Sequence, residues 1–235
     1  MTKLWIIRHG QASFGDSDYD KLSDTGILQS RILGRYFKST GTEFHIAYVG
    51  TMKRQIDTAD IALSELCQGS RPLKALSEAA FNEYDFKPII TALLPELLVD
   101  EPDMNHVLPN IFKDNREFQK MFGKIMDRWV SGRYATPGIE TYAQYTGRVR
   151  EGLVRVTDLE DDKPCIAVFT SGGVISVAMQ MALGLSDHEA MRLAWWVKNT
   201  SVTLLDYKKG RFNLLYFNLL SHLELENKPE LLTYR

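Results

Sequence analysis

Three segments of the 235-residue chain place arginine, histidine and small hydroxyl residues directly after apolar runs that predict buried strands. These segments are Arg8-His9-Gly10, Thr51 to Arg54, and Thr170 to Gly173. In open α/β sheets, ligands bind beyond the carboxyl ends of the strands. If the three strand ends are neighbours in the sheet, we expect their side chains to line one cleft.

The residue types in these segments suit a phosphate-sized anion. The guanidinium groups of Arg8 and Arg54 can bind phosphate oxygens, and the helices expected after the second and third segments present N-termini that favour negative charge. A neutral imidazole at His9 can attack phosphorus and carry the phosphoryl group covalently. The nearby positive charges lower the imidazole pKa, which keeps the ring unprotonated. The segments therefore predict phosphoryl chemistry.

The elements that must position these residues alternate between strand and helix. Apolar and β-branched runs predict strands, and apolar residues at helical spacing predict helices between them. The predicted strands lie at 3–7, 44–49, within 72–81, at 165–169, and in a hairpin of 201–207 with 212–217. The run at 165–169 is typical of a central strand that is covered on both faces. The sequence thus predicts an α/β fold, a three-layer α/β/α sandwich with a mostly parallel central sheet.

Residues 86–135 differ from the rest of the chain, because they combine four prolines, mixed charges and short helical patterns. We interpret them as a helical cap inserted into a single domain that spans residues 1–235. The chain length fits one domain with an insertion better than two separate domains.

Composition excludes several classes of function. The formal net charge is −2, whereas general nucleic-acid binders and proteins that bind anionic membranes are normally basic. The two cysteines, Cys67 and Cys165, give no disulfide framework or thiolate zinc site, and the histidines lack metal-ligand spacing with carboxylates. The N-terminal residues do not resemble a signal peptide, and the apolar stretch 172–185 is too short to span a bilayer. We expect a cytoplasmic protein without a metal.

The chain resembles the histidine phosphatase superfamily, also called phosphoglycerate-mutase-like, over most of its length. The motifs that carry the resemblance are Arg8-His9-Gly10, Leu22 to Gly26 with Gln29, Arg54 to Ala59, Phe81 to Asp85, Asn199 to Leu205, and Asn218 with His222-Leu223. The resemblance implies that His9 takes the phosphoryl group, that Arg8 and Arg54 bind its oxygens, and that Glu83 protonates the leaving alcohol and then activates water. It implies no metal and no other cofactor. Gly10, Ser171 and Gly172 are the further candidates for phosphate binding.

Two features depart from the family pattern. The family has a second histidine directly before the Gly-Gly that follows the central strand, and this chain has Ser171 there. A serine can donate a hydrogen bond but no positive charge, and the loss of one preorganised donor typically costs on the order of 10²–10³ in rate. Ser171 is also a natural helix N-cap. Histidines elsewhere could replace the missing one; the candidates are His45, His188 and His222.

The second departure concerns the general acid, because Glu78 and Glu83 both lie in the relevant segment. We favour Glu83, since Phe81-Asn82-Glu83 matches the family pattern of an apolar residue two places before the acid.

The sequence therefore predicts a histidine phosphatase that hydrolyses a phosphomonoester, with activity that Ser171 lowers, redirects or abolishes. A phosphatase is favoured over a mutase, because Gln11 to Phe14 replaces the Glu-Ser-x-Trp-Asn pattern of the mutases. The alternative is a catalytically impaired module that binds a phosphorylated ligand or regulates a partner. A phosphohistidine protein phosphatase is a third reading, against which the insertion at 86–135 argues. The expected partner is a phosphorylated small molecule, with no nucleic acid and no membrane; a homodimer is left open.

Overall fold

The computed structural model describes residues 2–13, 20–69, 71–106, 115–134, 136–158 and 164–234. The chain divides into two compact units, which are Met1–Glu83 with Arg148–Arg235, and Tyr84–Gly147. The predicted insertion at 86–135 falls within the second unit, although its residues 107–114 and 135 lie outside the described part of the chain.

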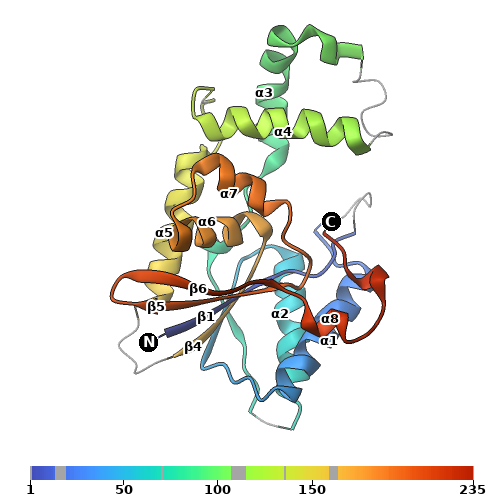
Figure 1. Cartoon of the computed structure of the whole chain (residues 1–235), viewed down its shortest axis with the longest axis vertical. Helices are drawn as coiled ribbons and strands as arrows, with labels where there is room; N and C mark the ends of the chain where they lie inside the picture. The colour runs from blue at the N-terminus through green and yellow to red at the C-terminus, as the bar shows by residue number, and fades with distance from the viewer. Residues whose placement is uncertain are drawn as a thin grey trace. The chain divides into compact units, whose positions relative to one another are not determined.

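A six-stranded sheet organises the first unit (Figure 1). Its strands are β1 (Thr2–Arg8), β2 (Ile46–Val49), β3 (Ala75–Ser77), β4 (Cys165–Thr170), β5 (Val202–Lys208) and β6 (Arg211–Leu219), in the order β3-β2-β4-β1-β5-β6. The first four strands pair in parallel, whereas β5 pairs antiparallel with both β1 and β6. The predicted α/β fold with a mostly parallel sheet is confirmed, and β4 lies inside the sheet as its apolar run predicts.

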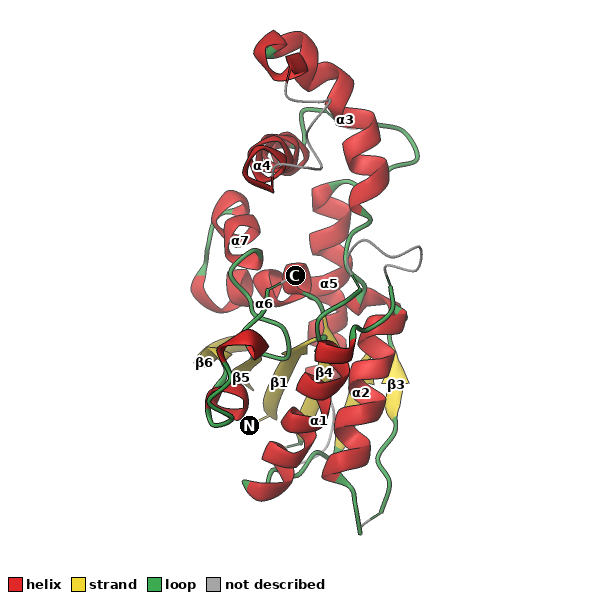
Figure 2. Ribbon diagram, turned by 90° about the vertical axis from the view of Figure 1, so that its right-hand side faces the viewer, coloured by secondary structure: helices red, strands yellow, loops and turns green. Residues whose placement is uncertain are grey.

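Helices cover both faces of this sheet. The helices of the first unit are α1 (Asp24–Ser39), α2 (Lys53–Leu66), α6 (Gly172–Leu183), α7 (Asp187–Ala194) and α8 (Ser221–Glu224). Helix α5 (Tyr142–Thr157) runs from the second unit into the first. Figure 1 shows α1 and α2 on one face and α6 on the other, and α1 and α2 pack side by side (Figure 2). Helices α1 and α2 bury apolar side chains against the strands, whereas α7 packs on α6 and α8 packs on α1. Helices on both faces of the sheet give the three-layer arrangement that the alternating pattern predicts.

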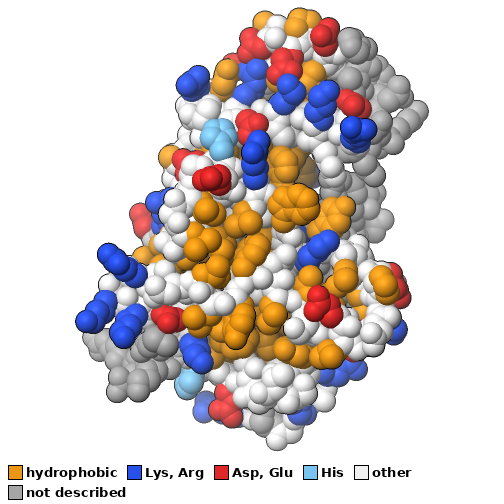
Figure 3. Space-filling model, in the orientation of Figure 1, with side chains coloured by type: hydrophobic (Ala, Val, Ile, Leu, Met, Phe, Trp, Pro, Cys, Tyr) orange, Lys and Arg blue, Asp and Glu red, His pale blue; other side chains and the backbone are white. Residues whose placement is uncertain are grey.

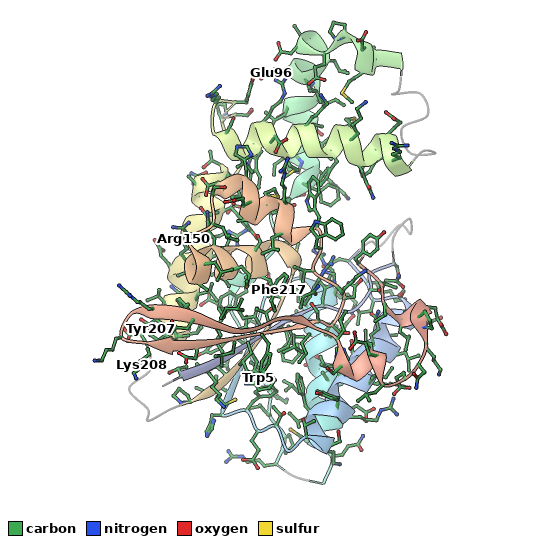
Figure 4. All side chains as sticks on the ribbon, in the orientation of Figure 1. Trp5, Glu96, Arg150, Tyr207, Lys208 and Phe217 are labelled. Atoms are coloured by element: carbon green, nitrogen blue, oxygen red, sulfur yellow. The ribbon has the colours of Figure 1, made fainter. Side chains whose placement is uncertain are left out.

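One hydrophobic core lies between the sheet and the pair α1 and α2. It is built from buried side chains of β1, β2, β4 and β5 on one side and of the two helices on the other: Ile7, Leu33, Phe37, Ala47, Val49, Ala59, Ala62, Leu63, Ala167, Phe169 and Val202. Trp5 packs edge-on against Phe37, with the ring centroids 5.8 Å apart, and is labelled in Figure 4. This core holds the ends of three parallel strands in fixed register.

The second unit contains α3 (Phe86–Asp100), a short 3₁₀ helix, η2 (Pro102–His106), and α4 (Asn115–Ser131). An aromatic cluster joins them to the start of α5. Trp129 lies 4.9 Å from Tyr84 and 5.2 Å from Tyr142 between ring centroids, and its indole N–H donates to the Glu140 carbonyl at 2.8 Å. Within the described residues, no helix combines the length and apolar character needed to cross a membrane.

The β5–β6 hairpin turns at Lys208 to Gly210, where Lys209 and Gly210 have φ of 50° and 77°. Tyr207 and Lys208 mark the end of the hairpin in Figure 4. The lysines therefore belong to a tight turn, as the sequence predicts. Strand β6 forms the sheet edge, and exposed apolar side chains gather along it and nearby (Figure 3), among them Tyr216, 57% exposed, and Trp196, 72% exposed.

Two glycines let the start of α1 lie directly against the loop that follows β1. A Cβ on Gly26 would be 2.2 Å from the Gln11 carbonyl oxygen, and a Cβ on Gly10 would be 2.6 Å from the Gly26 carbonyl oxygen. Both neighbours are backbone atoms, so a larger side chain has to displace the chain itself. This contact positions the loop that follows β1 against the first turn of α1.

Gly26→Ala is expected to lower the free energy of unfolding by about 1–3 kcal/mol, because the added methyl group overpacks two backbone segments. Urea unfolding monitored by circular dichroism would measure the change. Gly147→Ala is the matched control, since a Cβ at Gly147 meets nothing within 4 Å and that residue is helical. An alanine there should be neutral or stabilise by up to about 1 kcal/mol. Equal effects at the two sites would contradict the packing argument.

Candidate active site

The carboxyl ends of β1, β4 and β2 meet at one edge of the sheet. Arg8 pairs in register with Thr170, and the His9 amide donates to the Thr170 carbonyl at 2.8 Å. On the other side of β4, the Gly50 amide donates to the Phe169 carbonyl at 3.2 Å. The three predicted segments therefore lie together because parallel pairing aligns the ends of their strands.

His9 is buried, at 6% exposure, and its two ring nitrogens have different partners. Nδ1 lies 2.7 Å from the Gly10 carbonyl oxygen, and the Nε–H of Arg54 points to Nε2 at 3.2 Å. A carbonyl only accepts and an arginine only donates, so Nδ1 carries the proton and Nε2 carries the lone pair. Burial lowers the pKa of His9 well below its usual value, and the charges of Arg54 and Arg8 add to that effect against the Gly10 hydrogen bond. The ring is neutral, with Nε2 as the nucleophilic atom.

Backbone and side-chain hydrogen bonds hold the loop that carries His9. The Gly10 amide donates to Thr58 Oγ1 at 2.9 Å, so in this structure Gly10 orients the imidazole through its carbonyl while its N–H serves the loop. The His9 carbonyl accepts from the Thr200 amide at 3.2 Å and from Asn199 Nδ2 at 3.1 Å. The sequence analysis placed Asn199 in a motif without a role, and its position directly before β5 is the signal that could have suggested one.

Arg54 lies in the first turn of α2 and is buried, with 6% of the residue exposed. Its Nε faces His9, while its NH1 group lies 2.5 Å from the Asp20 carboxylate. Asp20 also accepts from the Lys53 amide at 2.7 Å and so bridges the N-terminus of α2. A positive side chain in a first turn opposes the helix dipole, and the Asp20 carboxylate offsets that repulsion. The sequence alone did not point to Asp20. Asp20 is described in the structure, whereas residues 14–19, which precede it, lie outside the described part of the chain.

Arg8 extends from the end of β1 to the C-terminal part of the chain. Its guanidinium donates to the Val197 carbonyl and, at 3.2 Å, to the Tyr234 carbonyl. The Lys198 ammonium lies 4.3 Å from the centroid of the Tyr234 ring, a cation–π contact. These two carbonyl oxygens orient the Arg8 guanidinium, and they carry no charge of their own.

Ser171 occupies the N-cap position of α6, yet its side chain makes no capping hydrogen bond. Its Oγ accepts instead from Gln55 Nε2 at 2.8 Å. Gly172, the next residue, lies against α7, because a Cβ there would be 2.8 Å from the Ala194 carbonyl oxygen. Ser171 thus lies beside the end of β1, and its hydroxyl is held by α2. Gln55 lies within the motif Arg54 to Ala59, but the sequence alone suggested no role for it.

The two candidate acids occupy different environments. One carboxylate oxygen of Glu83 accepts from the Gly173 amide at 3.0 Å, which places Glu83 at the N-terminus of α6 beside Ser171. Glu78 caps the short 3₁₀ helix η1 (Ala79–Phe81) and accepts from Arg155 at 2.8 Å. Burial raises the pKa of Glu78, but the hydrogen bonds from the Ala80 amide and Arg155 outweigh it and hold the pKa below its usual value. Glu78 is thereby occupied by structural contacts.

The three other candidate histidines, His45, His188 and His222, lie in different surroundings. His45 Nδ1 accepts from the Cys165 amide at 3.0 Å, at the opposite end of β4 from Ser171, and His188 is exposed on α7. His222 is buried behind Thr200, with Nε2 2.9 Å from Thr200 Oγ1. In the described ranges, no three His, Cys, Asp or Glu side chains are grouped as a metal site requires.

His222 is expected to make stability depend on pH, because burial lowers its pKa from 6.5 to about 3. The unfolded chain then binds a proton that the folded chain excludes between these values, so stability falls as pH decreases below 6.5. From pH 6.5 to 5 the loss from His222 is about 2 kcal/mol. Urea unfolding at pH 7, 6 and 5 would show a shallower pH dependence for His222→Gln than for the parent. An unchanged slope in the variant would contradict the burial argument.

Comparison with known sequences identifies several relatives. A model of the histidine phosphatase superfamily (branch 1) matches residues 4–98 and 112–220. The 2,3-bisphosphoglycerate-dependent phosphoglycerate mutases of Methylorubrum extorquens (strain PA1) and Bradyrhizobium diazoefficiens are each 33% identical over 90 residues. These matches cover 35% of this chain and 41% and 42% of the two relatives, so the chain matches less than half the length of either mutase.

Solved structures with a similar fold cover nearly the whole chain. A phosphoglycerate mutase from Bacillus anthracis has a TM-score of 0.65 at 17% identity and covers 97% of each chain. A phosphoserine phosphatase from Entamoeba histolytica, solved with 3-phosphoglyceric acid, has a TM-score of 0.63 at 19% identity and covers 95% of this chain and 100% of its own. At such identities the likeness concerns the fold. Together with the family model, which spans both the Arg8-His9-Gly10 segment and the segment after β4, these findings show that the chain belongs to the histidine phosphatase superfamily, branch 1.

Proposed function

We propose that this protein hydrolyses a phosphomonoester through a phosphohistidine formed at Nε2 of His9. The observation that carries the proposal is the arrangement around that imidazole. The Gly10 carbonyl holds the proton on Nδ1, and burial with two neighbouring arginines favours the neutral ring. Nε2 therefore keeps its lone pair at the end of β1, which supports His9 as the acceptor of the phosphoryl group.

The arginines supply the positive charge for the phosphoryl group. Arg54 contacts Nε2 in the structure, so an oxygen of a phosphoryl group bound to Nε2 falls within reach of the same guanidinium. Arg8 approaches from the end of β1, and the Gly172 amide at the N-terminus of α6 adds a backbone donor. Ser171 contributes a hydroxyl donor at the position where the family has an imidazole, and it brings no charge. We expect this to lower the rate on the order of 10²–10³ relative to a site with a charged donor.

The reaction then takes two steps. His9 Nε2 attacks phosphorus, the bond from phosphorus to the ester oxygen breaks, and Glu83 gives its proton to the departing alcohol. In the second step Glu83 takes a proton from water, whose oxygen attacks the phosphorus and displaces His9. Inorganic phosphate leaves, and both His9 and Glu83 return to their starting protonation states.

His9→Ala is expected to remove turnover of an aryl phosphate, because no other described side chain is placed to accept the phosphoryl group. Arg54→Ala should lower kcat/KM by on the order of 10²–10³, the usual cost of losing a positioned donor. Steady-state assays from pH 5 to 8 would measure both, with His188→Ala as the control for an exposed histidine. Full turnover in His9→Ala would refute the phosphohistidine. A parent protein no more active than His9→Ala would favour the module that binds phosphorylated ligands without turnover.

Glu83→Gln is expected to slow an alkyl phosphate far more than an aryl phosphate, since an alkoxide needs a proton to leave and a nitrophenolate does not. Glu78→Gln is the matched control: it alters a carboxylate five residues away that binds Ala80 and Arg155. The control should keep kcat on both substrates while lowering the melting temperature. If the leaving-group effect follows Glu78→Gln instead, the two roles are reversed.

A further inference from the structure

We infer that Gln55 is a positioning residue for this site, which orients the Ser171 hydroxyl so that its hydrogen points to the phosphoryl group. The inference rests on the proposed function and deepens it. It assigns a role to a buried glutamine whose side chain binds Phe81 and Ser171, and it treats Gln55 and Ser171 as one unit.

The orientation of the Gln55 amide follows from its two neighbours. Its side-chain nitrogen lies 3.1 Å from the Phe81 carbonyl oxygen and 2.8 Å from Ser171 Oγ. A backbone carbonyl only accepts, so the amide group must turn its NH₂ toward Phe81. The same NH₂ then donates to Ser171, whose oxygen acts as the acceptor.

This hydrogen bond decides where the serine proton goes. Because Ser171 Oγ accepts from Gln55, its own hydrogen remains for a second partner. Among the described residues, the hydroxyl donates to none, and Ser171 is buried at 1% exposure. The preceding residue, Thr170, accepts from the His9 amide at 2.8 Å, so Ser171 lies beside the nucleophile at the end of the sheet. An oxygen of a phosphoryl group on His9 can therefore accept the hydrogen bond that the Ser171 hydroxyl donates.

The surroundings of Gln55 indicate that the useful part of its side-chain amide is the NH₂ group, which donates hydrogen bonds. The side chain is fully buried, and a Cβ on Gly50 would be 2.0 Å from its Oε1, so Gly50 leaves the room that the amide fills. Within the described residues, Oε1 has no hydrogen-bond partner. An unpaired buried acceptor destabilises a protein, and an apolar side chain of similar size would avoid that cost. The NH₂ group, with its bonds to Phe81 and Ser171, is what an apolar side chain could not provide.

The same geometry limits what residue 171 can be. Gln55 Nε2 lies within hydrogen-bond distance of the first heteroatom of the Ser171 side chain, and both side chains are buried. A larger side chain at 171 would therefore overlap the amide unless Gln55 were shortened. The small hydroxyl at 171 and the long amide at 55 fit as a pair.

A double-mutant cycle tests the unit directly, with Gln55→Met, Ser171→Ala and the double variant compared with the parent. Met keeps the volume and removes the donor. We expect each single change to lower kcat by about 10-fold, and the double variant to be no slower than Ser171→Ala, because Gln55 acts through Ser171. Effects that multiply in the double variant would overturn the inference.

The matched control is Gln180→Met, which removes another buried glutamine amide from the first unit. Gln180 on α6 accepts from Arg150, labelled in Figure 4, and donates to Asp187. Gln180→Met should lower the melting temperature without changing kcat, whereas Gln55→Met should lower kcat. Equal kcat values for the two variants would show that Gln55 has a structural role only.

Binding of inorganic phosphate, measured by calorimetry on the same four proteins, separates this inference from the proposed function. A parent protein without His9-dependent turnover would refute the proposed function. Comparing the phosphate affinities of the four proteins would still test the pair. Losses in affinity that are not additive between Gln55→Met and Ser171→Ala would support the positioning role, and additive losses would refute it. A second experiment uses Ser171→His, whose larger side chain should overlap the Gln55 amide. We expect kcat to fall in Ser171→His alone and to rise again when Gln55→Ala is added. A faster single variant would overturn the steric part of the inference.

Discussion

The contact between the Arg54 guanidinium and Nε2 of His9 is the interaction on which the site depends. A guanidinium beside an imidazole is tolerated only while the ring is neutral, and burial enforces that neutrality. The Gly10 carbonyl fixes the proton on the opposite nitrogen. In the proposed reaction, His9 is thus deprotonated at the atom that attacks, next to the guanidinium proposed to bind the phosphoryl oxygens. That reaction needs no general base to activate His9.

Elements from distant parts of the chain position His9 and Arg54 beside each other. Parallel pairing of β1 with β4 aligns His9 with the start of α6, and Arg54 arrives from the first turn of α2. The Asn199 and Thr200 donors hold the His9 carbonyl from the other side. These contacts come from segments far apart in the chain, so the site forms only when the sheet is complete.

Ser171 places a neutral hydroxyl group at the N-terminus of α6, where β4 ends. The hydroxyl is fixed by Gln55, and Glu83 binds the α6 amide one residue beyond Gly172. A neutral, fixed donor stabilises less charge than an imidazolium, but it does not titrate in the range where histidine does. The site therefore combines two arginines with a donor whose protonation does not change with pH.

The sequence by itself determined the local parts: the apolar run that makes β4 an inner strand, the strand end that carries Arg8 and His9, and the helix start that carries Arg54. These follow from periodicity and from residue type, which act over a few positions. Only the tertiary structure showed that Glu83 and Glu78 have different partners, because both lie in one short segment and differ in whether Gly173 or Arg155 reaches them. The bond between Gln55 and Ser171, 116 residues apart, was equally hidden. Such pairs depend on how α2 and α6 pack against the same strand ends, and no local pattern in the chain encodes that register.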